Sequence, residues 1–235
     1  SFFKKNRLIM QWDDIGYLVS KNRYNENSVM VEFYTKDHGK CSGVIFGGTS
    51  KKIKNYLQIG NKFHINYNYK IEGKLGYFKV EIFKVYTPFY FNNKKKLLCI
   101  TSAMNLIKLL TVELQENFKI FDAIEDFFIN LNNENWTKKY VFWELKILKY
   151  IGYDIDLKKI INSEIIKNEK KYYLKSNTNK KYIPNFLIDK DDKRIDNDSL
   201  LKGLNLVGDY MNKNILKPNN INYPNARLEF INLFK

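Results

Sequence analysis

The hydrophobic period of the chain changes near Pro88, and this change constrains the fold more than any other feature. Before this proline, short runs rich in β-branched and aromatic residues are separated by Gly and Asn, and Val29, Val31 and Phe33 alternate with polar or larger residues. After it, apolar residues recur every three or four positions, the period of an amphipathic helix. With 235 residues and 44% hydrophobic content, the chain can bury a core. The sequence predicts an α+β protein, a β unit followed by helices.

The first half is predicted to form five short antiparallel strands. They are expected at Ile15–Lys21, Ser28–Thr35, Lys40–Phe46, Lys62–Ile71 and Gly76–Val85. Turns are expected at residues 37–39 and 72–74, and a loop at 47–52. Five such strands in about 70 residues fit an OB-type or an SH3-like barrel.

The second half is predicted to be helical. Helical spacing of apolar residues marks Leu97–Leu114, Ile120–Leu131, Val141–Ile151, Asp198–Lys213 and Asn225–Phe234. Gly152 is expected to end the third helix, and Asp198 or Ser199 to cap the fourth. Trp143, Leu145, Leu148 and Ile151 are expected in the core of this part.

Between the third and fourth helices, the segment 162–183 is polar and Lys-rich, and we expect a loop-like insertion with at most weak strands. The predicted organisation is therefore an N-terminal extension at residues 1–9, an OB-fold domain at 10–88 and an all-α domain at 89–235.

The balance of charge indicates a polyanionic partner. Forty Lys and Arg against 25 Asp and Glu give a formal charge of +15, which favours nucleic acid or an acidic membrane surface. AT-rich coding sequence would also produce such a Lys-rich and Asn-rich composition without any selection for binding. Part of the positive charge can therefore come from codon bias. The longest uncharged apolar run, Leu97 to Ile107, is well short of the ~20 residues that span a bilayer. With no readable secretory signal at the N-terminus, a cytoplasmic, non-membrane protein is expected.

Catalytic and metal-binding patterns are not recognisable in the sequence. His38 and His64 stand in neither a metal-ligand nor a triad spacing, and the glycines of residues 43–48 lack the Gly-Lys-Ser/Thr of a phosphate loop. The adjacent carboxylates at Asp13–Asp14 are expected to be solvated, and Cys41 to be a buried free thiol. Two cysteines are too few for a disulfide framework or a four-cysteine zinc site. We expect no enzyme, no metal and no cofactor.

A binding function has more support, because single-strand binding needs cations along a groove and rings on which bases stack. The β-rich half supplies both. The candidate DNA-binding residues are Arg23, Tyr24, Lys36, Lys40, Lys51, Lys52, Lys54, Lys62, Lys70 and Lys74. For any one of them a solvated barrel face is the commoner explanation; for the cluster at 51–54 binding is favoured.

Several segments of the chain together form a family pattern. The pattern begins in residues 12–19 and continues through 26–40, with a Thr-x-x-His-Gly turn at Thr35–Gly39. It returns at Trp143-Glu144-Leu145 and at Pro224-Asn225-Ala226-Arg227, so that it covers the chain from about Met10 to the end. In these segments the chain resembles the bacterial RecO family of recombination mediators.

This resemblance implies an OB-fold domain and a helical domain without enzymatic turnover. It implies binding to single- and double-stranded DNA, strand annealing, work with RecR, and help to RecA in replacing single-stranded-DNA-binding protein, whose acidic C-terminal tail the family recognises, in RecFOR gap repair. Location at the nucleoid during repair would follow. Some members carry a four-cysteine zinc module; residues 158–181 here contain no cysteine, so no zinc site is implied. The family usually starts at a methionine, here Met10, so that residues 1–9 are an alternative start or a basic extension.

The alternatives are an OB-fold protein-interaction adaptor and an RNA-binding protein without mediator activity. An adaptor would bind DNA weakly and without sensitivity to barrel mutations, whereas an RNA-binding protein would prefer structured RNA to single-stranded DNA. A hydrolase is the least favoured class.

Overall fold

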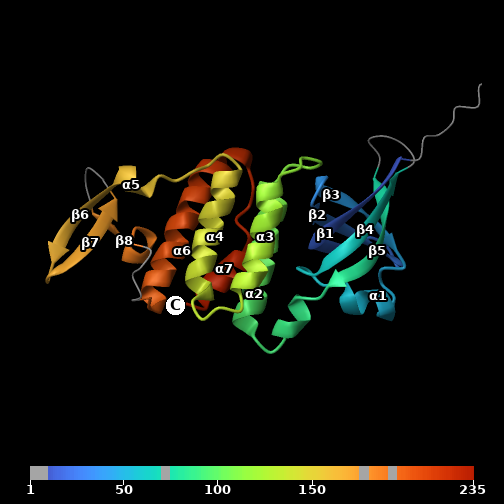
Figure 1. Cartoon of the computed structure of the whole chain (residues 1–235), viewed down its shortest axis with the longest axis horizontal. Helices are drawn as coiled ribbons and strands as arrows, with labels where there is room; N and C mark the ends of the chain where they lie inside the picture. Colours follow the sequence, from blue (N-terminus) through green and yellow to red (C-terminus); the bar gives the residue numbers. More distant parts are fainter. Residues whose placement is uncertain (1–9, 70–74, 175–179, 190–194) are drawn as a thin grey trace, which may run out of the picture. The chain divides into compact units, whose positions relative to one another are not determined.

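The structure is a computed structural model that describes residues 10–69, 75–174, 180–189 and 195–235 (Figure 1). The chain divides into two compact units, Ser1–Phe121 and Asp122–Lys235. The first unit contains five strands and the second contains helices with a small sheet. This agrees with the predicted α+β class. The limit predicted near residue 88 stays a prediction, since the first compact unit also takes in the helix that follows the strands.

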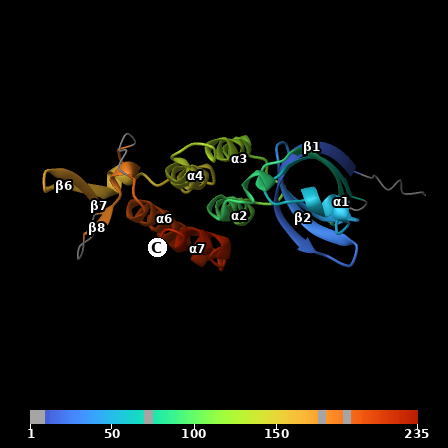
Figure 2. The same cartoon turned by 90° about the horizontal axis from the view of Figure 1, so that it is seen from below.

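The first unit is built on a closed barrel of five strands. These are β1 (Met10–Arg23), β2 (Ser28–Thr35), β3 (Gly39–Phe46), β4 (Lys62–Tyr69) and β5 (Gly76–Lys84). Around the barrel their order is β1-β2-β3-β5-β4, with β4 pairing back to β1, and Figure 2 shows β1 and β2 curving around it. The neighbours pair antiparallel except β3 and β5, which are parallel. The five predicted strands and the OB fold are confirmed, although β1 begins five residues earlier than predicted and the β3–β5 pair is parallel where antiparallel strands were predicted.

Alternation along the strands fills the barrel with aromatic and aliphatic side chains. Phe33 is fully buried and packs edge to face on Phe63 and Phe78, with ring centroids 5.5 and 5.2 Å apart. Gly43 lies under Phe78, where an added Cβ would come within 2.6 Å of that ring. A strand glycine is therefore needed here, because the ring occupies the space of a side chain.

The turn between β2 and β3 is locked by a buried carboxylate. Asp14 accepts a hydrogen bond from the backbone N–H of Asp37 at 2.9 Å and lies 2.8 Å from Nδ1 of His38, whose ring stacks on Trp12. Gly39 follows with φ +67°, a left-handed conformation that favours glycine. The expectation that Asp14 is solvated was wrong. Alternation along β1 leaves Asp13 exposed and turns Asp14 inward, where these donors satisfy it.

Two helices belong to the first unit. Residues 51–56, predicted to begin in a loop, form α1 (Lys51–Tyr56), whose N-cap is Ser50. A short 3-10 turn, η1 (Thr87–Tyr90), leads to α2 (Lys94–Leu110). α2 stops before Leu114, which is exposed and has φ +56°. Nζ of Lys40 donates to the carbonyls of Lys108 and Thr111 at 2.9 and 2.7 Å, so this lysine satisfies acceptors at the helix end.

The second unit contains the later helices. They are α3 (Phe118–Asn130), which starts four residues before the unit, α4 (Trp136–Tyr150), α5 (Leu157–Ile160), α6 (Asn197–Met211) and α7 (Asn225–Asn232). Gly152 follows α4 with φ +93°, as expected for a residue that ends a helix. The N-cap of α6 is Asp196, so the prediction of Asp198 or Ser199 as the cap was wrong, although Ser199 completes the capping box from the third helical position. Among the described residues, no helix is long and apolar enough to cross a membrane.

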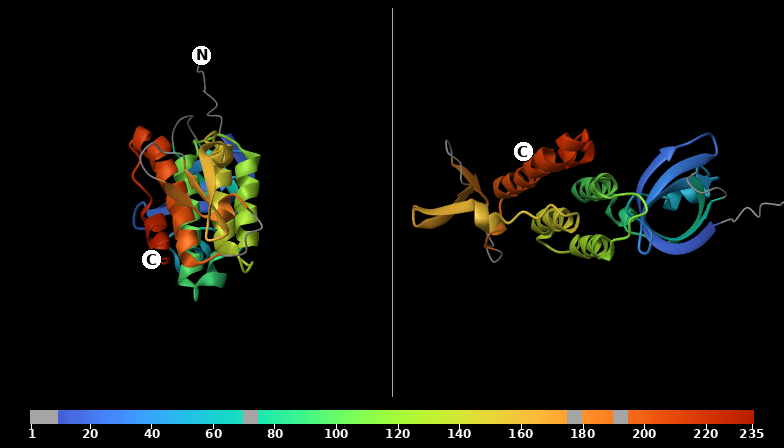
Figure 3. Two further views of the ribbon diagram at one scale, coloured as in Figure 1. Left: turned by 90° about the vertical axis from the view of Figure 1, so that its left-hand side faces the viewer. Right: turned by 90° about the horizontal axis from the view of Figure 1, so that it is seen from above.

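A small antiparallel sheet interrupts the helices, drawn in yellow and orange in Figure 3. It consists of β6 (Ile161–Ile166), β7 (Glu169–Leu174) and β8 (Lys181–Ile183). Lys167 and Asn168 both have positive φ, as a two-residue hairpin turn requires. The loop-like interpretation is corrected for residues 162–174 and 181–183, residues 175–179 lying outside the described part of the chain, and the all-α description of this domain is corrected as well. The usual Asn-Gly signal is missing, since a lysine takes the first left-handed position.

The core of the second unit centres on α4. Trp143 and Leu148 are buried as predicted, and Nε1 of Trp143 donates to the carbonyl of Ala123 at 2.7 Å. Leu145 and Ile151 are only partly buried. The buried stripe instead includes Glu144, because this carboxylate has a buried partner from α7. The buried face of α4 therefore includes a charged residue and differs from the face that the apolar residues alone predicted.

Candidate nucleic-acid interface

Several predicted cations gather around one cleft of the barrel, which we call the α1 cleft. Its volume is about 560 Å³, and Lys21, Arg23, Glu26 and Lys54 are its charged lining residues. Lys51 and Lys52 are exposed on the first turn of α1. Three cations therefore face one carboxylate, with two further lysines on the same short helix.

Local hydrogen bonds shape the walls of the α1 cleft. The backbone N–H groups of Tyr24 and Asn25 donate to the carbonyl of Ser28 and close the turn between β1 and β2. Oγ1 of Thr49 donates to the carbonyl of Glu26 at 2.9 Å and joins this turn to the segment before α1. In OB folds, the loop between the first two strands is one of the elements that bind oligonucleotides. Tyr24, 55% exposed in that turn, presents a ring to solvent.

Lys21 lines the α1 cleft but was missed from the sequence. Its Nζ donates to the carbonyl of Leu57 at 2.6 Å, which holds the ammonium beside α1. Burial, together with the nearby Lys54, lowers the pKa of Lys21 below its usual value. An anion bound in the cleft would relieve this repulsion. The sequence signal that could have found Lys21 is its spacing from Arg23. Two residues that are two positions apart on one strand point to the same face of the sheet.

The remaining predicted residues lie outside the α1 cleft. Lys40 binds the end of α2, and Lys62 is buried, with its Nζ 5.3 Å from the ring centroid of Tyr17 and 5.1 Å from that of Phe121. Lys36 is exposed beside the β2–β3 turn. Lys70 and Lys74 lie outside the described residues. Of the residues predicted from the sequence, the interface therefore keeps Arg23, Tyr24 and the α1 lysines, and Lys21 is added to them.

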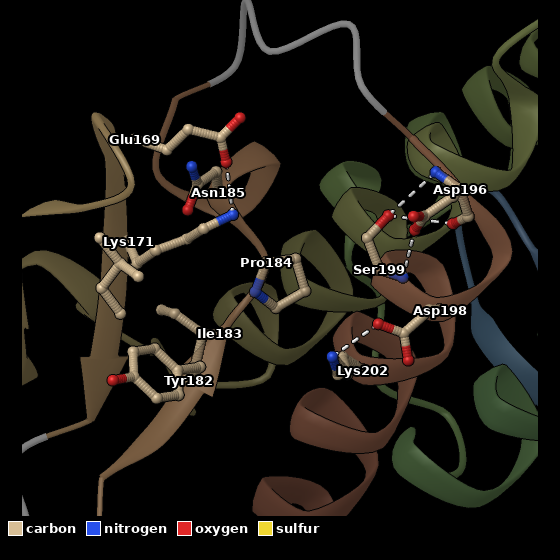
Figure 4. A pocket seen from close by; sticks show the side chains of 11 residues that line it. Glu169, Lys171, Tyr182, Ile183, Pro184, Asn185, Asp196, Asp198, Ser199 and Lys202 are labelled. Carbon is tan, nitrogen blue, oxygen red and sulfur yellow. Dashed lines mark hydrogen bonds and ion pairs between the residues drawn. The ribbon is translucent and has the colours of Figure 1, made fainter.

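A second pocket, in the other unit, is a poorer candidate (Figure 4). It has a volume of about 480 Å³ and lies between the β6–β8 sheet and the start of α6. Its charged residues are paired with each other: Lys171 with Glu169 at 2.7 Å, and Lys202 with Asp198 at 2.6 Å. Asp196 accepts the N–H of Ser199 as the cap of α6. Among the described residues, no three His, Cys, Asp or Glu are placed together to hold a metal ion.

Comparison with known proteins places the chain in a family. Residues 10–86 match the model of the recombination protein O N terminal, and residues 93–218 match that of the recombination protein O C terminal. The chain belongs to the RecO family. The RecO resemblance noted in the sequence is thus confirmed, and residues 87–92 separate the two matched regions.

Relatives in the RecO family carry the name DNA repair protein RecO. That of Rickettsia africae (strain ESF-5) is 34% identical over 150 residues, 64% of this chain and 63% of the relative. That of Rickettsia typhi (strain ATCC VR-144 / Wilmington) is 30% identical over 234 residues, 94% of this chain and 98% of the relative. The chain thus spans less than two thirds of the first relative and nearly all of the second.

Proposed function

We propose that this protein is a DNA-binding recombination mediator of the RecFOR gap-repair pathway. Family membership and the DNA-repair names of the relatives support the role. The observation that carries the proposal is the α1 cleft, where Lys21, Arg23 and Lys54 surround one hollow of an OB barrel. The protein acts by holding strands and has no turnover in this proposal.

The cations contact phosphates at two places. Lys21, Arg23 and Lys54 do so along the cleft, and Lys51 and Lys52 do so on the first turn of α1. Annealing follows from the same charges, since two complementary strands repel each other until cations neutralise their phosphates. Tyr24 offers a ring for one unpaired base.

The partners of this function are part of the proposal. They are single- and double-stranded DNA, RecR, the acidic C-terminal tail of single-stranded-DNA-binding protein, and RecA indirectly. An acidic tail requires a basic, partly apolar surface, which the family resemblance implies for the helical domain. We assign no residues to it.

The proposal is tested by fluorescence polarisation of a labelled oligo-dT against the whole chain over a range of KCl concentrations. We expect binding that weakens with salt, with a log–log slope of about −0.7 per phosphate contact. The acidic tail peptide of the cognate single-stranded-DNA-binding protein, titrated separately, is expected to bind saturably. Peptide binding without DNA binding would favour the adaptor, and a clear preference for structured RNA would favour an RNA-binding protein.

A further inference from the structure

A short segment of the first unit exposes an unusual run of aromatic rings. Phe83 at the end of β5, Phe89 in η1 and Phe91 just after it are 49%, 79% and 58% exposed. We call residues 83–94, which connect β5 to α2 (Figure 1), the aromatic segment. Large apolar side chains that are exposed together at a surface mark an interaction site.

The backbone of the aromatic segment is anchored to the barrel. Oδ1 of Asn61 accepts the N–H groups of Tyr86 and Thr87 at 2.8 and 3.2 Å, and the buried hydroxyl of Thr87 donates to the carbonyl of Ile59. Pro88 follows and fixes its own φ. Because the backbone is held in this way, the exposed rings are presented on a fixed support. Such pre-organisation lowers the entropic cost of binding a ligand.

Lysines interleave with the rings of the aromatic segment. Nζ of Lys84 lies 5.0 Å from the ring centroid of Tyr86, and Lys94 is exposed where α2 begins. The first turn of α2 has no acidic residue, although the helix dipole would favour one there. An apolar protein partner would need the rings but not this charge. Rings and cations together fit bases and phosphates of an unpaired strand.

We propose that the aromatic segment is a base-stacking site for single-stranded nucleic acid, separate in sequence from the α1 cleft. Phe89 and Phe91 stack on unpaired bases, and Lys84 and Lys94 contact the phosphates between them. Stacking needs only the flat face of a base, so the site has no sequence preference and favours single strands over duplex, whose bases are already stacked. The proposal rests on the proposed DNA-binding function.

The test compares an oligo-dT with an abasic oligonucleotide of the same length, which keeps the phosphates but offers no bases. The whole chain is measured by fluorescence polarisation as the unchanged protein, as the Phe89→Ala/Phe91→Ala variant, and as Leu114→Ala, an exposed apolar control in the same unit. The double variant is expected to bind oligo-dT about 25-fold or more weakly, on the basis of about fivefold or more for each of the two lost stacks, and to bind the abasic strand unchanged. Leu114→Ala is expected to match the unchanged protein on both.

The outcomes separate this inference from the proposed function. Salt-sensitive binding of oligo-dT by the unchanged protein, with no loss in the double variant, would overturn the stacking site and leave DNA binding intact. Equal loss on oligo-dT and abasic strands would also overturn it, because bases would then not be involved. If the unchanged protein binds neither strand, the proposed function itself fails. Urea unfolding of the double variant checks that the barrel is intact.

Discussion

The Arg227→Met variant is expected to lose about 3–5 kcal/mol of stability in the second unit. Arg227 on α7 is fully buried and forms two hydrogen bonds with the equally buried carboxylate of Glu144 on α4, at 2.8 and 2.6 Å. Its guanidinium also donates to the carbonyl of Leu204 at 2.7 Å and to the hydroxyl of Tyr223. Methionine fills similar space but leaves the Glu144 carboxylate buried without its partner.

The residues around Arg227 stabilise its charge and leave space for its guanidinium. Burial alone would disfavour the charged guanidinium, but the carboxylate of Glu144 outweighs it and raises the pKa of Arg227 above its usual value. Gly208 on α6 leaves room for the guanidinium, since an added Cβ would lie 2.5 Å from its Nη1. The pair therefore joins three helices at one buried point.

Urea unfolding followed by Trp fluorescence and far-UV circular dichroism measures this effect. A second variant, Glu144→Leu/Arg227→Met, removes both charges and is expected to recover much of the loss, because no unpaired charge remains. If Arg227→Met loses less than about 1 kcal/mol of unfolding free energy, the account of a buried Glu144 carboxylate left without its partner is contradicted.

Replacing Lys51, Lys52 and Lys54 by alanine is expected to weaken oligo-dT binding by up to about a hundredfold at 0.1 M salt. If each lysine contacts one phosphate, the magnitude of the log–log salt slope falls by about 0.7 per contact, and the three losses together give this factor. All three side chains are exposed, so the variant should keep the stability of the unchanged protein. The measurement is the polarisation titration repeated across KCl concentrations.

A matched control removes the same charge elsewhere. Lys158, Lys213 and Lys217 are exposed in the second unit, and their joint replacement by alanine also lowers the net charge by three. We expect this control to retain most of the affinity and of the slope. Equal effects of the two triple variants would mean that net charge, and not the α1 cleft, determines binding.

Local patterns predicted much of this molecule because they depend on neighbours in the sequence. The alternation that buries Val31 and Phe33 predicts strands, and the helical spacing predicts the later helices. The hairpin of β6 and β7 was not predicted from the sequence, because its turn places Lys167 in a left-handed conformation and lacks the glycine that usually indicates such a turn.

Pairings across long separations were not predictable from one sequence. Glu144 and Arg227 stand in two segments that resemble RecO, 83 positions apart, and only the fold joins them as an ion pair. In the same way, Lys62 was predicted to be available to DNA, yet aromatic rings bury it. Lys21 was not among the predicted residues, yet it lines the α1 cleft. A lysine's type says that it is cationic; its surroundings decide whether the charge is available to DNA.

The most direct test asks whether DNA lies along the α1 cleft. The native thiols are unsuited to labelling, since Cys41 and Cys99 are buried and burial raises the pKa of Cys41 to about 12. A single exposed cysteine in Lys52→Cys can therefore carry a benzophenone photo-crosslinker selectively. Glu134→Cys, in the exposed turn before α4, provides the control position.

The measurement is the yield of photo-crosslinks to a labelled oligo-dT from these two positions. The account predicts a yield from position 52 several times that from position 134, suppressed as KCl is raised. Equal yields from the two positions, or a higher yield from position 134, would contradict the placement of DNA in the α1 cleft.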